Sequence, residues 1–99
     1  MTIEEKEKFL TEKIKLMLDD INYGITSISS YLSKDCLLRD GTYKDAIITS
    51  FYEPVMCNSL SVYSDPDTLE HLYVRTGPMN FIDIEEFFQP YKEDEDLEK

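Results

Sequence analysis

The one histidine of the chain, His71, lies close in sequence to three acids that could join it in binding a metal ion. These acids are Asp65, Asp67 and Glu70. A calcium loop of the EF-hand type has oxygen ligands at its first, third and fifth positions, a glycine at its sixth and a glutamate at its twelfth. Asp65 and Asp67 would be the first and third, so the fifth, sixth and twelfth positions decide the match. Counted from Asp65, these positions hold a leucine, a glutamate and a threonine. We therefore expect no metal site and no cofactor, and we interpret the segment as a solvated turn.

Two cysteines, Cys36 and Cys57, supply the thiols that a nucleophilic mechanism would need. Each would depend on His71 as its base, because a catalytic cysteine is activated by a neighbouring imidazole. Cys57 falls inside a predicted strand, where a cysteine is usually inert packing. The three glycines are far apart, so the sequence holds no glycine-rich phosphate loop. We expect a protein that is not an enzyme and whose thiols are reduced, because two distant cysteines make no disulfide framework.

The charge balance excludes further classes. The 99 residues carry 21 acids against ten lysines and arginines, which gives a formal net charge of −11. A nucleic-acid binder that works through a general basic field is excluded, because such binding is mainly phosphate neutralisation. The hydrophobic share of 41% is typical of a folded protein. The charged N-terminus is unlike a signal peptide, and no apolar run approaches the roughly 18 residues of a membrane span, so we expect a cytoplasmic protein.

The acids are concentrated near the C-terminus. Residues 83–99 hold eight acids and two lysines, which is −6 of the total −11. Large apolar side chains lie among them from Phe81 to Tyr91. Acidic surfaces steer a protein toward basic partners, and aromatic side chains supply affinity that charge alone does not. The segment therefore predicts a partner-binding surface. Its candidate residues are Asp83, Glu85, Glu86, Tyr91, Glu93, Asp94, Glu95 and Asp96.

The N-terminal segment has the pattern of a long amphipathic helix. Thr2 and Glu5 have the spacing of a capping box. Apolar residues then recur at steps of three and four. We expect a helix over 3–22 and a shorter helical continuation near 25–33, with a kink or a break at Gly24.

This apolar stripe has two interpretations. It covers the sheet, which is the default for an amphipathic helix. Alternatively, its near-heptad spacing suits association of two copies through the helix, which would give a homodimer. The candidate oligomerisation residues are Leu10, Ile14, Met17 and Ile21.

The middle of the chain predicts strands. Residues 43–52 are rich in β-branched and aromatic side chains, and Pro54 ends the run. Segments 56–63 and 70–76 alternate apolar and polar residues on either side of a turn at 64–67, which predicts an antiparallel hairpin.

Two segments are predicted with less regular signals. Residues 34–42 are interpreted as a connection that ends in a turn at Arg39-Asp40-Gly41-Thr42. Asn80 is a predicted N-cap for a C-terminal helix that places Phe81, Ile84, Phe87 and Phe88 on one face, although residues 79–84 could instead form a strand.

The elements together predict an α+β fold. We expect a long N-terminal helix packed on a small antiparallel sheet of about three strands, followed by a short C-terminal helix. A single domain would cover residues 1–91, and residues 92–99 would form an acidic tail.

In size, charge and aromatic content the chain resembles two groups of small acidic proteins. One is the phage-encoded anti-defence inhibitors, including DNA mimics such as anti-restriction, anti-CRISPR and uracil-glycosylase inhibitor proteins. The other is the immunity proteins that neutralise nuclease toxins. The resemblance implies a non-catalytic inhibitor that blocks a basic, nucleic-acid-handling protein and does not itself contact nucleic acid or membrane. The alternative is a small adaptor that oligomerises through its N-terminal helix.

Overall fold

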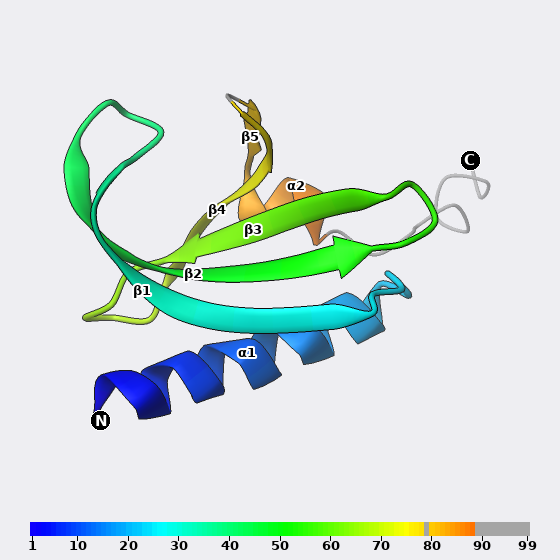
Figure 1. The fold of residues 1–99 in the computed structure, drawn as a ribbon, viewed down its shortest axis with the longest axis horizontal. Helices are drawn as coiled ribbons and strands as arrows, with labels where there is room; N and C mark the ends of the chain where they lie inside the picture. The colour runs from blue at the N-terminus through cyan, green and yellow to red at the C-terminus, as the bar shows by residue number, and fades with distance from the viewer. Residues whose placement is uncertain (79, 89–99) are drawn as a thin grey trace, which may run out of the picture.

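The computed structural model describes residues 1–78 and 80–88 and has two helices and one sheet (Figure 1). The sheet is antiparallel, and its five strands lie side by side in chain order. The fold is therefore α+β as predicted, with five strands rather than about three. The elements are α1 (Ile3–Asp20), β1 (Ser27–Leu37), β2 (Tyr43–Glu53), β3 (Asn58–Ser64), β4 (His71–Gly77), β5 (Asn80–Ile82) and α2 (Ile84–Phe87).

Helix α1 begins and packs as its sequence predicts. The Thr2 hydroxyl accepts the Glu5 N–H, and the Glu5 carboxylate accepts the Thr2 N–H, so the capping box is complete. The side chains of Leu10, Ile14 and Leu18 are fully buried. The stripe thus covers the sheet, as in the first of the two interpretations.

The helix predicted near 25–33 is wrong, because residues 27–33 lie in β1 and residues 25–26 belong to the connection before it. The four-residue step from Ile28 to Leu32 fits the helical period, but it also fits the period of two of a strand. Ile28 and Leu32 are partly buried on the side of α1, and the residues between them alternate in exposure. Serine, threonine and β-branched residues are weak helix formers, so the strand is favoured here.

The central strands confirm the hairpin predictions with small shifts. β2 ends at Glu53 before Pro54, and β3 pairs with β4 across the predicted turn. The predicted turn at 39–42 also forms, and in it the Gly41 N–H donates a hydrogen bond to the Leu38 carbonyl. The prediction that Cys57 lies in a strand is wrong. This residue lies in the β2–β3 turn, exposed and with a φ of +57°.

Two corrections concern the remaining segments. β1 continues to Leu37, through a register irregularity between Ser33 and Cys36, so the predicted connection is shorter than 34–42. Asn80 lies in β5 and not at a helix N-cap, which instead is Asp83. The alternative prediction of a strand within residues 79–84 is thus confirmed for residues 80–82.

Apolar clusters lie on both faces of the sheet. On the first face, α1 packs against Phe51, Leu60, Val62 and Val74. The second face carries Ala46, Ile48, Tyr63 and Tyr73, with Phe81 and Leu38 packed against them. No helix of the described chain covers this second cluster. The end of the β1–β2 hairpin, residues 34–45, curls toward it instead, and we call this segment the arm (Figure 1).

Candidate functional site

The predicted partner-binding residues fall partly within the described chain. Asp83, Glu85 and Glu86 are exposed at α2. Asp83 is not free to meet a partner in the same way as the other two, because its Oδ1 accepts a hydrogen bond of 2.8 Å from the Arg39 guanidinium. Tyr91, Glu93, Asp94, Glu95 and Asp96 lie outside the described residues.

Aromatic packing holds α2 in place. The Phe87 ring lies 5.3 Å from the ring of Tyr23 and 6.2 Å from that of Phe51, measured between centroids. Such pairs stabilise by about 1 kcal/mol beyond the area that they bury. Burial and the nearby Glu53 carboxylate raise the pKa of Tyr23. Tyr23 therefore links α2, the end of α1 and the end of β2.

The segments that meet near Tyr23, namely the end of α1, the end of β2 and α2, carry acids without lysine or arginine. In the described chain, every Lys and Arg lies in the first fifteen residues, in the arm, or at Arg75. We call residues 19–20, 53–57 and 84–88 the acidic end. The β2–β3 turn and the last turn of α1 lie at the same extremity of the molecule in Figure 1. The acids of this end are Asp19, Asp20, Glu53, Glu85 and Glu86.

Two of these acids sit where helix physics disfavours them. Asp19 and Asp20 occupy the last turn of α1, which has no basic residue. The C-terminus of a helix carries a partial negative charge, so an acid there destabilises the helix by about 0.3–1 kcal/mol. Among residues 1–78 and 80–88, the Arg39–Asp83 pair is the one salt bridge. The charge of the acidic end is thus not neutralised by direct partners within the described chain.

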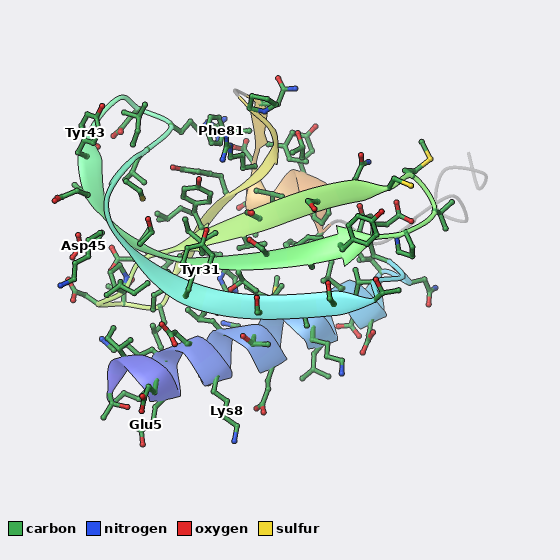
Figure 2. The ribbon with its side chains drawn as sticks, in the orientation of Figure 1. Glu5, Lys8, Tyr31, Tyr43, Asp45 and Phe81 are labelled. Carbon is green, nitrogen blue, oxygen red and sulfur yellow. The ribbon has the colours of Figure 1, made fainter. Side chains whose placement is uncertain are left out.

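The chain up to residue 18, before the acids of the last turn of α1, carries charges of both signs. Residues 1–18 hold four acids and four lysines, so they carry no net charge. Figure 2 shows Glu5 and Lys8 of this segment pointing away from the sheet. The acids of the acidic end therefore differ from those of the first turns of α1, which have lysines beside them in the sequence.

The oligomerisation residues are distributed between core and surface. Leu10 and Ile14 are fully buried within the chain, and Met17 and Ile21 are partly buried. A second copy cannot reach Leu10 or Ile14 in this fold without displacing the sheet. The exposed apolar residues of α1 are instead Phe9 and Leu16, at 42% and 65% exposure.

The residues around His71 stabilise their own turn and the core. The Asp65 carboxylate accepts the N–H groups of Thr68 and Asp67, which lowers its pKa. His71 Nδ1 lies 3.1 Å from the hydroxyl oxygen of Ser64, and the side chain of Ser64 is fully buried. Burial, with a smaller contribution from Lys13, lowers the pKa of His71. In the described ranges, no group of three or more potential ligands could hold a metal ion.

The arm and β4 line a cavity that no sequence pattern predicts. Its volume is about 580 Å³. Its lining combines Leu38, Leu72 and Tyr73 with charged side chains of both signs on the arm and with Asp65 of the β3–β4 turn. The Tyr73 hydroxyl accepts the Arg39 N–H at 2.9 Å, and the Arg39 guanidinium lies 5.7 Å from the centre of the Tyr73 ring. The Arg39 residue thus holds the arm against the second apolar cluster.

In the described residues, neither helix has the length and apolarity that a bilayer span requires. No protein-family model, curated protein or solved structure matches the chain.

Proposed function

We propose that this protein is a non-catalytic binding inhibitor that occupies a basic surface of a nucleic-acid-handling protein. The observation that carries the proposal is the acidic end, which exposes the carboxylates of Asp19, Asp20, Glu85 and Glu86 and holds no lysine or arginine. Carboxylates presented together resemble the phosphates that such a basic surface is built to bind. The proposal covers anti-defence inhibitors of the DNA-mimic type and immunity proteins alike.

Electrostatics decides how such a protein would find its target. Association between oppositely charged surfaces is faster than between neutral ones and falls steeply with ionic strength. Glu85 and Glu86 are the two exposed acids of the predicted surface that no described cation neutralises. They are therefore the first residues to test, and Asp83 is assigned to holding Arg39.

The function is tested by capturing a partner at low salt and measuring its affinity at rising salt. We expect a basic, nucleic-acid-binding partner whose affinity for this protein falls as salt rises, and which releases the protein when a duplex oligonucleotide is added. Glu85→Gln/Glu86→Gln should slow association by about tenfold. The matched control is Glu4→Gln/Glu12→Gln, which removes two exposed acids from the neutral first part of α1.

Three results would contradict the proposal. The first is a partner that binds equally well at all salt concentrations. The second is a partner that binds the oligonucleotide and this protein at the same time. The third is an equal loss in the test and control variants, which would make the position of the acids irrelevant.

A further inference from the structure

The β2–β3 turn exposes two apolar side chains at the extremity of the molecule. Val55 is 84% exposed and Met56 is 70% exposed. Neither belongs to one of the two apolar clusters. Single exposed apolar residues are ordinary on protein surfaces, but an adjacent pair at the tip of a hairpin contributes no packing to its own chain.

The backbone of this turn is held by a buried carboxylate. Glu53 is 7% exposed, and its two carboxylate oxygens accept the N–H groups of Val55 at 2.7 Å and Met56 at 2.8 Å. Hydrogen bonds to an ionised acceptor are about twice as strong as neutral ones. Cys57 closes the turn with a positive φ. Pro54 is the first residue of the turn, and its ring fixes its own φ. The turn is therefore preorganised, which reduces the entropy that binding would cost.

The negative charge of the chain limits what the apolar pair could meet. The net charge is −11, and the last turn of α1, which carries Asp19 and Asp20, lies at the same extremity as the turn (Figure 1), so an anionic lipid surface would repel this end. A second copy is also disfavoured, because each chain carries a net charge of −11. A folded protein with cationic residues around an apolar pocket is complementary to both properties.

We propose that Val55 and Met56 form an apolar anchor that inserts into a pocket of the partner protein, with lysines and arginines of that partner bordering the pocket. This inference rests on the proposed function, because it takes the basic character of the partner from there. It adds the contact that holds the complex once charge has brought the two proteins together. Truncating two side chains buried at the centre of an interface typically weakens binding by about 30-fold or more.

The two contributions have different salt signatures, which makes them separable. Val55→Ser/Met56→Ser should weaken affinity by about 30-fold at every salt concentration and leave the slope of affinity against salt unchanged. Glu85→Gln/Glu86→Gln should reduce that slope. The matched control is Leu16→Ser, which removes an apolar side chain of 65% exposure from α1. Thermal melting should change little in all of these variants, because the altered side chains are exposed.

The experiment places the photocrosslinker p-benzoylphenylalanine at position 55, 56, 86 or 16 of the full chain in a native lysate. We expect adducts from 55, 56 and 86 with one and the same basic protein, and none from 16. Titration of that purified protein with the serine double variant must then show the salt-independent loss. An adduct from 86 alone, with unchanged affinity of the double variant, would overturn the anchor and leave the proposed function standing.

Other outcomes separate the two proposals further. Adducts from 55 and 56 with a protein that binds independently of salt would overturn the proposed function and the basic border of the pocket together. Binding of the protein to neutral phosphatidylcholine vesicles, lost in the double variant, would overturn the anchor in favour of a lipid surface. Concentration-dependent dimers lost in the double variant would assign the turn to a second copy instead.

Discussion

The two faces of the sheet bury their apolar residues by different means. On the first face, α1 presses fully buried aliphatic side chains such as Ile14 and Leu18 onto the strands. On the second face, the tyrosines 63 and 73 lie under the arm, and polar groups of Arg39 hold the arm there. In Figure 2, Phe81 lies beside the arm, in keeping with its place in this second cluster. Aliphatic burial on the first face is non-directional, whereas the second face depends on a few oriented contacts. The first face should therefore set global stability, and the second should open locally.

The largest expected effect is on the first face. Leu18→Ala removes a fully buried side chain and leaves a cavity, so the free energy of unfolding should fall by about 2–5 kcal/mol. Chemical denaturation monitored by circular dichroism measures this change. The control is Leu16→Ala on the same helix, which should cost less than about 0.5 kcal/mol because its side chain is exposed. Equal losses in the two variants would contradict the assignment of α1 to the core.

A smaller, local effect is expected on the second face. Arg39→Ala removes the guanidinium from both the Tyr73 ring and Asp83, while the backbone N–H that reaches Tyr73 remains. Exposed ion pairs and cation–π contacts contribute about 1 kcal/mol or less, so global stability should change little. Amide hydrogen exchange should instead accelerate in the arm and around Tyr73. Lys34→Ala is the matched control, and unchanged exchange in Arg39→Ala would show that the arm holds without this residue.

The smallest expected effect is a dependence of the free energy of unfolding on pH, which arises from His71 at the edge of the first face. The pKa of His71 lies below its ordinary value of 6.5, so as pH falls through 6.5 the unfolded chain takes up a proton before the folded chain does. The free energy of unfolding should therefore be highest above pH 6.5, fall below it, and level off below the folded pKa. Denaturant titrations between pH 5 and 8 measure this slope. It should disappear in His71→Gln and weaken in Lys13→Gln, because the Lys13 charge contributes to lowering the pKa. A slope that persists in His71→Gln would assign it to other groups.

Local signals made much of the fold predictable. The capping box, the first apolar stripe and the β3–β4 turn are each specified by residues close in sequence, and each forms as predicted. The misassignment of β1 has a physical cause, because the Ile28–Leu32 step suits both periods and only tertiary packing decides between them. The C-terminal segment is similar, since β5 forms only by pairing with β4.

The candidate site was less accessible to sequence reasoning. The exposure of Glu85 and Glu86 agrees with the predicted acidic surface, but its use by a partner stays a prediction. The Arg39–Asp83 pair joins residues far apart in the chain, and no periodicity encodes such a contact. The exposure of Val55 and Met56 has no sequence signal, because two apolar residues beside Pro54 resemble the start of a strand. It depends on the Glu53 carboxylate, which holds the backbone of these residues in a turn.

The chain-order arrangement of the strands has a consequence for synthesis on the ribosome. Because each strand pairs with its neighbours in sequence, β1–β2, β2–β3 and β3–β4 can each close as soon as their residues emerge. α1 is made first, but the strands on which it packs, β1 and β2, are made later. Until these strands emerge, only the capping box and local hydrogen bonds support α1, and its apolar stripe faces water. A nascent chain that stalls before β2 would therefore expose Leu10, Ile14 and Leu18 to water and to chaperones.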